Sequence, residues 1–196
     1  MTDDASLAAR LATDLDGHFE ELVRTFQDRL YGFALRLTGS PPDAEESAQD
    51  TFLRAYRALQ RYPNDRIETL KLKAWLYQIA LNVVRNRLRG GQLKQLAMDE
   101  SVSNSLAANV RDEQPEQATI GAESLDELGR ALRQLPERYS IAVVLRHVQG
   151  LSYAEAAQVL GQPVGTTKSD VHRGLRLLRA ALEPELQVLA RGEQYA

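Results

Sequence analysis

The sequence predicts an all-α protein made of two small helical domains joined by an irregular acidic linker, with a helix-turn-helix in the second domain. Apolar residues recur at the three- and four-residue spacing of amphipathic helices along most of the 196 residues, and no stretch alternates like a strand. Residues 92–122 are rich in Ser, Asn, Gln and acids and lack this period, so they separate two helical segments. We expect an acidic N-terminal extension over 1–17, a first domain over 18–91, a linker over 92–122, a second domain over 123–183 and a C-terminal tail over 184–196.

The first domain is predicted to hold three helices, over 19–37, 41–59 and 75–88. Ser40 followed by Pro41 is a typical start for the second of them, because the serine can cap the helix and proline suits its first position. The third helix pairs apolar residues from Trp75 to Leu88, and we expect it to end at Gly90-Gly91.

The second domain is predicted to begin with a leucine-rich helix over 125–135. Pro136 opens a second helix, whose apolar positions run from Ile141 to Val148 and whose stop is Gly150. The helix-turn-helix follows directly.

The helix-turn-helix spans Leu151 to Leu178. Ser152 and Glu155 form a capping-box pattern, and Gly161-Gln162-Pro163 makes the turn. The second helix has an apolar face of Val171, Leu175 and Leu178. Its other face is polar and basic, as expected for a helix that enters a major groove, and it carries Thr167, Lys168, Ser169, His172, Arg173 and Arg176. An amphipathic core helix with a solvated charged face would give the same pattern.

Several functional classes lack their signatures in this sequence. There is no cysteine, and the three histidines fall on three different predicted helices, so we expect no metal site and no cofactor. No phosphate-binding glycine loop or paired nucleophile is present, which predicts a protein that is not an enzyme. The acidic N-terminus does not read as a secretory signal and no apolar run could span a bilayer, so we expect a soluble intracellular protein.

The net charge of −3 conceals a partition of charge along the chain. No acid lies between Glu68 and Asp99, whereas six acids and one arginine lie from Asp99 to Glu123. Blocks of opposite sign are typical of a nucleic-acid binder with an acidic linker.

Three segments together resemble the extracytoplasmic-function sigma factors of bacterial RNA polymerase: DAEESAQDTFLRAYRAL, AWLYQIALNVVRNRLR and LPERYSIAVVLRHVQGLSYAEAAQVLGQPVGTTKSDVHRGLRLLR. The resemblance covers roughly residues 17–183. It implies that the first domain is sigma region 2 and the second is region 4. It also implies that the protein is a promoter-specificity subunit that acts in a stress or signal response. Such a subunit promotes DNA melting through binding energy within the polymerase complex. The implied partners are core polymerase, through its largest-subunit coiled coil and its flap, promoter DNA, and an anti-sigma factor. The implied location is the cytoplasm, at the nucleoid in holoenzyme or at a membrane through an anti-sigma factor.

The resemblance implies that the second helix of the first domain docks on the polymerase coiled coil. The outward residues of this helix are Asp43, Glu46, Gln49, Asp50 and Leu53. Carboxylates around an exposed leucine suit a basic partner helix, although an ordinary solvated acidic face has the same composition. Ser47-Ala48 departs from the bulkier aliphatic residues common in the family.

The resemblance also implies that the loop over 61–73 and the third helix read an unpaired strand of the minus-ten element. The residues that would do so are Tyr62, Lys71, Lys73, Gln78, Asn82, Arg85, Asn86 and Arg89. Amides can bond the edge of an extruded base, cations can hold phosphates and an aromatic ring can stack on a base. Tyr62 is the stacking candidate, whereas Trp75 falls on the apolar stripe and is assigned to the core. The loop is longer than in many relatives.

In the second domain, the family's reading positions for the minus-thirty-five element correspond to Lys168, Ser169, His172 and Arg173, with Thr166 and Thr167 near the DNA backbone and Arg176 on the same face. Asp170 departs from the family, which commonly has a base there. This carboxylate could repel phosphates, accept from a cytosine, or pair with Arg173. Our prediction is repulsion, which would keep the isolated domain from binding duplex DNA tightly.

Two other functions fit part of the sequence. A self-sufficient repressor or activator would use the first domain for dimerisation or sensing, but such a bundle does not need a third helix that is basic and free of acids. A sigma mimic that holds an antagonist would not need the DNA-reading residues that the chain retains. The promoter-specificity subunit explains both features.

Overall fold

A computed structural model of the chain describes residues 4–99 and 119–192, with side chains described over 4–90 and 127–183. These residues are helical and include no strand, which confirms the predicted fold class. The elements are α1 (Asp4–Thr13), α2 (Leu15–Thr38), α3 (Pro41–Leu59), α4 (Asn64–Glu68), α5 (Leu72–Asp99), α6 (Thr119–Gln134), α7 (Glu137–Val143), the π-helix η1 (Val144–Val148), α8 (Tyr153–Leu160) and α9 (Val164–Gly192).

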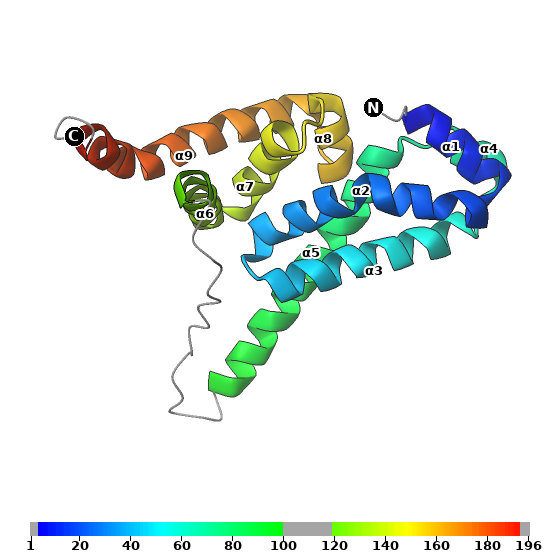
Figure 1. Ribbon diagram of the computed structural model, residues 1–196, viewed down its shortest axis with the longest axis horizontal. Coiled ribbons are helices and arrows are strands. Elements are labelled where there is room, and N and C mark those ends of the chain that lie inside the picture. Colours follow the sequence, from blue (N-terminus) through cyan, green and yellow to red (C-terminus); the bar gives the residue numbers. More distant parts are fainter. Residues whose placement is uncertain (1–3, 100–118, 193–196) are drawn as a thin grey trace.

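The first domain is a bundle in which α2 and α3 lie side by side and α5 packs across them (Figure 1). Gly39 ends α2 in the left-handed region at φ 70°, where glycine carries no Cβ penalty. Ser40 then caps α3 as expected, because its side chain accepts from the Asp43 amide. Inside the bundle, the Phe33 and Tyr77 rings meet edge to face, 5.3 Å apart.

The N-terminal helix α1 packs into this domain, although residues 1–17 were expected to precede it as an extension. Leu7, Ala8 and Leu11 are buried, and α1 covers α4 at one end of the bundle (Figure 1). The Asp4 carboxylate accepts from the Lys73 backbone amide at 3.3 Å, at the start of α5. The segment between α3 and α5 therefore packs on α1.

The second domain consists of α6, α7, η1, α8 and α9, with α9 running across α7 and α8 (Figure 1). The predicted capping box is confirmed, because Ser152 accepts from the Glu155 amide and Glu155 accepts from the Ser152 amide. Gly161 turns the chain at φ 64°. The helix that was expected to run to Val148 changes into a π-helix at Val144, with Gln149 N donating to Val144 O at 2.9 Å.

Three helix ends differ from the expected ones. α5 continues through Gly90-Gly91 to Asp99, because two glycines cost a helix only about 1 kcal/mol each and do not break it. α6 already begins at Thr119, and α9 continues to Gly192 into the expected tail. The rest of the predicted acidic linker, residues 100–118, lies outside the described residues.

The two domains contact each other directly. α8 packs on α5 and α6 packs on α2. Buried residues of both domains, among them Leu81, Leu132 and Ile141, form one continuous apolar cluster. A residue on α5 can therefore face either solvent or the second domain.

Candidate nucleic-acid and polymerase interfaces

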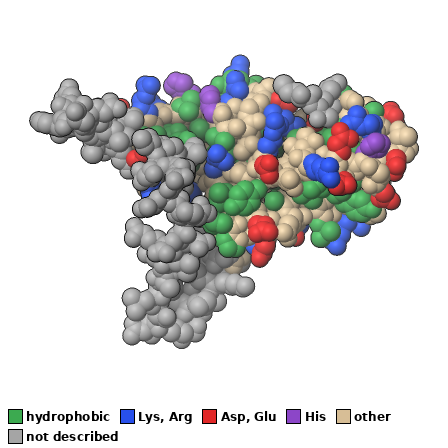
Figure 2. Space-filling view, in the orientation of Figure 1, with side chains coloured by type: hydrophobic (Ala, Val, Ile, Leu, Met, Phe, Trp, Pro, Cys, Tyr) green, Lys and Arg blue, Asp and Glu red, His purple; other side chains and the backbone are tan. Residues whose placement is uncertain are grey.

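The exposed face of α9 presents the residues expected to read duplex DNA. We call this set the α9 reading face: Thr166, Lys168, Ser169, His172, Arg173 and Arg176, all of which are exposed. Basic and histidine side chains follow the edge of the molecule that α9 forms (Figure 2). Four of the six residues line a shallow depression of about 470 Å³ together with Tyr153 of α8. The Lys168 ammonium lies 5.7 Å from the centre of the Tyr153 ring, a cation–π distance.

Two residues of α9 lie on faces other than those predicted. Thr167 was expected near the DNA backbone, but it is fully buried, and its hydroxyl donates to the Pro163 carbonyl at 3.2 Å. Leu175 was expected in the core, but it is 38% exposed. The helix is rotated relative to the predicted apolar stripe, so that Gly174 faces the domain interior instead.

Asp170 was predicted to be exposed and to repel phosphates, and this prediction is wrong. Asp170 is buried, with 1% of its surface exposed. Arg138 Nη2 of α7 donates to Asp170 Oδ1, and Gln162 Nε2 of the turn donates to Asp170 Oδ2 at 3.1 Å. The hydrogen bond with Asp170 raises the pKa of Arg138 above its ordinary value. The partner of Asp170 is therefore Arg138, not Arg173, and the carboxylate faces inward.

Gly174 marks the closest approach of α9 to α7. A Cβ atom built at this position would lie 2.6 Å from Val143 Cγ2 and 3.0 Å from the Tyr139 carbonyl oxygen. Any side chain at this position would have to push the two helices apart.

The amides of α5 are exposed along one side of the helix. We call Gln78, Asn82, Asn86 and Arg89 the α5 stripe; all four are exposed, at the spacing that the sequence predicted. Lys71, just before α5, is exposed as well. Amides and a guanidinium at this spacing can contact successive nucleotides of a single strand.

The neighbouring side of α5 contacts the second domain. We call Lys73, Tyr77 and Arg85 the α5 contact edge. Lys73 Nζ donates to the Gly150 carbonyl at 3.1 Å, the Tyr77 hydroxyl donates to Gln149 Oε1 at 2.6 Å, and Arg85 Nε donates to Glu137 Oε1 at 2.8 Å. Two of the cations expected to hold a DNA strand, Lys73 and Arg85, are thus bonded within the protein.

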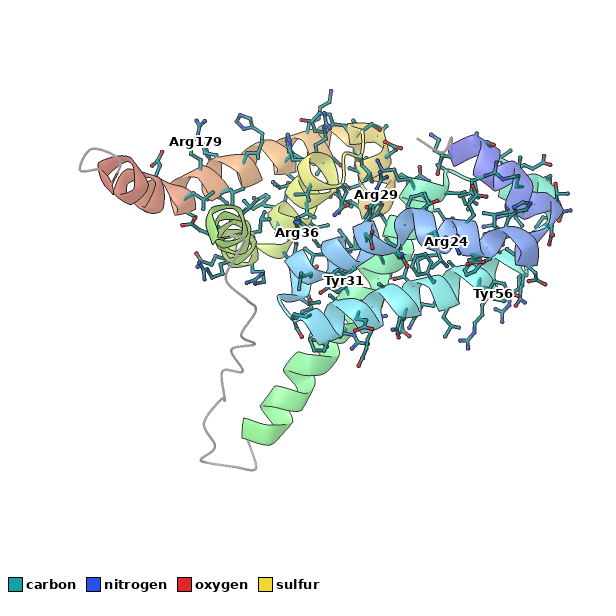
Figure 3. The ribbon with its side chains drawn as sticks, viewed as in Figure 1. Arg24, Arg29, Tyr31, Arg36, Tyr56 and Arg179 are labelled. Carbon is teal, nitrogen blue, oxygen red and sulfur yellow. The ribbon has the colours of Figure 1, made fainter. Side chains whose placement is uncertain are left out.

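Tyr77 is the buried member of this edge. Burial raises its pKa far above the ordinary tyrosine value, although the positive charges of Arg29 and Arg36 act in the opposite direction. Figure 3 labels these two arginines on α2. The phenol therefore remains protonated and acts as a donor to Gln149.

The aromatic residues beside α5 form a small cluster. Tyr62 and Trp75 are both partly buried, with ring centres 6.1 Å apart, and the Arg66 guanidinium lies 3.7 Å from the centre of the Tyr62 ring. Arg66 occupies one face of Tyr62, so a base could stack there only on the other face or after Arg66 moves.

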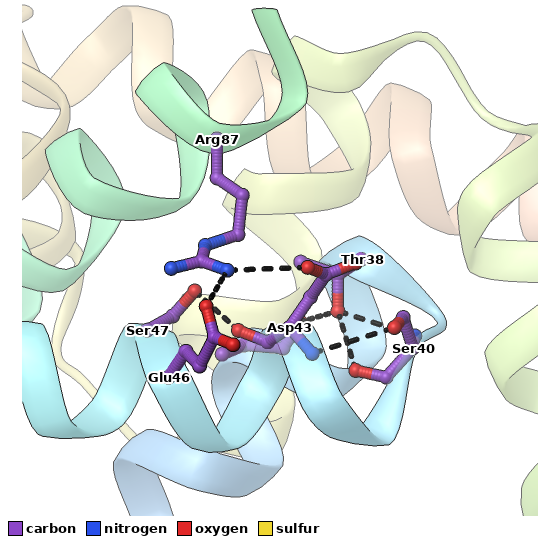
Figure 4. Close-up of polar contacts among 7 residues, drawn as sticks. Thr38, Ser40, Asp43, Glu46, Ser47 and Arg87 are labelled. Carbon is purple, nitrogen blue, oxygen red and sulfur yellow. Dashed lines mark hydrogen bonds and ion pairs between the residues drawn. The ribbon is translucent and has the colours of Figure 1, made fainter. Parts of the chain in front are cut away.

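The outward face of α3 carries the residues expected to dock on polymerase. Arg87 of α5 forms ion pairs with Asp43 and Glu46 (Figure 4). Gln49 and Leu53 are exposed and Asp50 is half-buried, one or more turns further along the helix. Ser47 is buried and its hydroxyl donates to the Asp43 carbonyl at 2.6 Å, so the small residue fits where Arg87 crosses α3.

An apolar hollow on α9 adjoins the reading face and shares two residues with it. Leu175, Leu178 and Leu182 of α9, with Arg179 and the reading-face residues His172 and Arg176, line a hollow of about 610 Å³; Arg179 is labelled on α9 in Figure 3. Within the described residues no group of three or more His, Cys, Asp or Glu is arranged to hold a metal ion. No helix in the described part of the chain is long and apolar enough to cross a membrane.

Four residues that shape these interfaces were not predicted from the sequence: Tyr77, Arg138, Tyr153 and Gln162. Tyr153 directly follows the helix cap Ser152, a position from which its ring could have been expected beside the second helix of the motif. Tyr77 and Arg138 act through partners distant in sequence, and Gln162 acts through polar side chains five and eight residues later; the apolar period reports none of these partners.

Comparisons with known proteins match both domains. The sigma-70 region 2 family matches residues 22–93 and the sigma-70 region 4 family matches residues 125–178. The chain is 31% identical over 189 residues to the RNA polymerase sigma-H factor of Pseudomonas aeruginosa, which covers 94% of this chain and 96% of that protein. It is 36% identical over 162 residues to the ECF RNA polymerase sigma factor SigE of Mycolicibacterium smegmatis, covering 82% of this chain and 60% of that protein.

A solved structure has a similar fold. The sigma factor RpoE, in complex with the anti-sigma factor NepR from Bartonella quintana, matches with a TM-score of 0.68 and 27% identity, over 84% of this chain and 96% of that chain.

Proposed function

The chain belongs to the extracytoplasmic-function family of RNA polymerase sigma factors, and we propose that its two domains divide promoter reading between α5 and α9. As a sigma factor it binds core polymerase, directs it to promoters and takes part in transcription initiation. In the proposal, residues 18–91 dock on polymerase and read the minus-ten element, and residues 123–183 read the minus-thirty-five element.

The exposed α9 reading face is the observation that carries the proposal. It begins in the first turns of the second helix of a helix-turn-helix, the part of such a helix that contacts base edges. Lys168 and Arg173 can donate to guanine, Ser169 can bond several bases, and Thr166 lies at the helix N-terminus, which favours a phosphate. Thr167 is not part of this set, because it is buried.

The α5 stripe is assigned to the unpaired minus-ten strand. Asn82 lies at its centre, with Gln78 and Asn86 one turn to either side. Extruding a base costs a few kcal/mol, which contacts to these amides and to Tyr62 would offset. Lys73 and Arg85 could contribute only after they leave Gly150 and Glu137.

The α3 face is assigned to the coiled coil of the largest polymerase subunit. Arg87 neutralises part of the charge of Asp43 and Glu46, so Gln49, Asp50 and Leu53 are the residues most available to a partner. We assign the polymerase flap to the three leucines of the α9 hollow, Leu175, Leu178 and Leu182, because apolar side chains suit an apolar helix; His172 and Arg176 of the same hollow stay with the reading face.

Regulation and location follow from the same proposal. A solved relative is in complex with an anti-sigma factor, and we propose that an anti-sigma factor also binds this chain. In the proposal the chain itself carries out no catalytic step. Its place of action would be the cytoplasm, at the nucleoid when bound to polymerase, or at the membrane if the anti-sigma factor is anchored there.

Transcription in vitro with core polymerase tests the reading assignment. Transcription from genomic DNA, with the start sites mapped, should show the same minus-ten and minus-thirty-five elements upstream of each start site. Arg173→Ala should lower transcription from those promoters and change the tolerated bases of the minus-thirty-five element only. An unchanged preference at every position would remove α9 from the reading role.

Docking is tested with two matched double variants. Gln49→Lys with Asp50→Lys places two positive charges on α3, whereas Gln27→Lys with Asp28→Lys places the same charges on exposed positions of α2. We expect only the α3 variant to stop co-purifying with core polymerase. Both should stay close to the parental melting temperature, because three of the four positions are exposed and Asp50 is half-buried, and surface substitutions change stability by less than about 0.5 kcal/mol. Equal polymerase binding by both variants would contradict the docking assignment.

A further inference from the structure

The inward face of α9 is unusually polar where the reading face is presented. Its first three turns bury Thr167, Asp170, Val171 and Gly174, and only Val171 has an apolar side chain of any size. Gln162 Nε2 donates to both Thr167 Oγ1, at 3.2 Å, and Asp170 Oδ2. Arg138 completes this set from α7.

We propose that Asp170, held by Arg138 and Gln162, is a positioning residue that fixes the rotation of α9 about its own axis. It thereby determines which base pairs the reading face can reach. The proposal rests on the reading role of α9 given above, and it adds three specificity-determining residues that do not themselves contact DNA.

Two points of attachment define the orientation of α9. Gly174 sets how closely the helix approaches α7, since a Cβ at this position would meet Val143 and the Tyr139 carbonyl. Asp170 lies one turn earlier, about 6 Å along the axis, and is tied to a different side chain of α7 and to the turn. Close packing at one point leaves the helix free to roll, and the hydrogen bonds at the other point remove this freedom.

A small roll would be enough to change base reading. Side-chain tips lie about 5–6 Å from a helix axis, so a rotation of about 20° moves them by about 2 Å. The useful range of a hydrogen-bond length is only about 0.5 Å wide. Lys168 and Ser169 directly precede Asp170, and His172 and Arg173 follow it closely, so any roll at Asp170 is transmitted to them without a flexible segment between.

Directional bonds can perform this task better than apolar contacts. Apolar burial has no preferred direction, whereas a carboxylate held by two donors on opposite sides does. A buried ion pair is also weak support for stability, because apolar residues of similar volume often replace it without loss. Stability and base preference can therefore be separated by experiment.

The decisive variant is Arg138→Met with Asp170→Leu, which replaces both charged side chains by apolar ones and removes the directional bonds. In holoenzyme, with a promoter library randomised at both elements, we expect discrimination at one or more minus-thirty-five base pairs to fall about tenfold, within the range that single base contacts supply. The minus-ten preferences should not change. The melting temperature should stay within about 4 °C of the parent, the shift that 1 kcal/mol produces in a chain of this size. Arg130→Met, an exposed arginine of α6, is the matched control and should change neither readout.

A double variant that folds and keeps the parental minus-thirty-five preferences would overturn the proposal. If the double variant melts lower, Arg138→Lys and Arg138→Met decide the question, because they alter only a side chain that is 57% exposed. Lysine should keep the parental preferences more fully than methionine, and identical profiles for both would also overturn it. Arg173→Ala in the same library separates the two proposals: if it changes no preference, the reading role of α9 fails instead.

Discussion

The helices α9 and α5 are both long and carry polar and basic side chains at helical spacing, but the structure supports them differently. On α9, the reading side chains are exposed and the polar residues behind them, Thr167 and Asp170, are bonded inward. On α5, the exposed stripe lies beside a contact edge whose donors, Lys73, Tyr77 and Arg85, are bonded to the second domain. The same residue types thus face DNA, the core or a neighbouring domain, depending on which side of the helix they occupy.

This difference shows that charge on a helix does not by itself identify a nucleic-acid contact. Lys73 and Arg85 fit the chemistry of phosphate binding as well as Arg89 does, yet only Arg89 is exposed. What distinguishes them is the packing of α8 against one side of α5, together with the bonds that Glu137, Gln149 and Gly150 make there. Five substitutions test this difference between α9 and α5.

Gly174→Val should have the largest effect, because it disrupts the close packing of α9 on α7. The added side chain would meet Val143 and the Tyr139 carbonyl, and overpacking of this kind costs about 2–3 kcal/mol in the free energy of unfolding. Urea denaturation measures it. Gly165→Ala on the same helix is the control, since a Cβ there meets nothing within 4 Å, and it should be neutral or stabilising. Equal loss in both variants would mean that α9 is not held at Gly174.

Asn82→Ala tests the exposed half of α5. We expect open-complex formation on a linear duplex promoter to fall about tenfold, and to fall much less on a template with a pre-melted minus-ten region, because the mismatch has already supplied the unpairing. Gln27→Ala removes an exposed amide from α2 and should leave both templates unaffected. Equal loss on the two templates would indicate that Asn82 has a packing role.

Ser152→Ala tests the cap of α8, which lies between the two helices, and should cost about 1 kcal/mol in the free energy of unfolding. The other half of this cap, Glu155, gives a prediction about pH. Burial opposes ionisation of Glu155, but its hydrogen bonds with Ser152 and the charges of Lys73 and Lys71 lower its pKa overall. A carboxyl with a lowered pKa stabilises the fold above its unfolded pKa of about 4.3, and this contribution is lost as the pH falls through the folded pKa. The stability difference between parent and Glu155→Gln should therefore be present at neutral pH and shrink below about pH 4. A constant difference from neutral pH to pH 3.5 would contradict this assignment.

Glu137→Ala should have the smallest effect, because it releases Arg85 at a site where both side chains are partly exposed. Loss of such an ion pair costs at most about 0.5 kcal/mol in stability. Binding of a single-stranded minus-ten oligonucleotide should strengthen, by less than about threefold, once Arg85 is free. Glu20→Ala, which removes the exposed ion pair with Arg24 on α2, is the control and should not change oligonucleotide binding. Weaker binding by Glu137→Ala would show that the pair with Arg85 favours the reading surface.

Outward-facing features could be predicted from the sequence because they depend on local spacing. The capping box of Ser152 and Glu155, the Ser40 cap and the exposure of Gln78, Asn82 and Asn86 follow from helical period alone. The all-helical class follows from the same period.

Inward polar residues could not be predicted in this way. A hydrophobic pattern assigns Asp170 and Thr167 to the solvent side because it registers only apolar residues, and it cannot see that Arg138 and Gln162 satisfy them. The helix α1 was missed since its sequence reads mainly as an acidic terminus, although Leu7 and Leu11 anchor it. The contact edge of α5 depends on where the second domain packs, which no local pattern specifies.

The π-helix η1 makes the second domain sensitive to insertions and deletions at one place. Gln149 N donates to the carbonyl five residues earlier and Leu151 N donates to Leu145 O, six residues earlier, at 3.0 Å. This wide turn delivers Gln149 and Gly150 to α5 and Ser152 to the start of α8. Deleting one residue between Val144 and Gly150 would let the turn rewind as an α-helix, and every following residue would move by about 100° and 1.5 Å relative to α7. The domain contact and the reading helix would lose their register together, so the length of this turn is as constrained as its sequence.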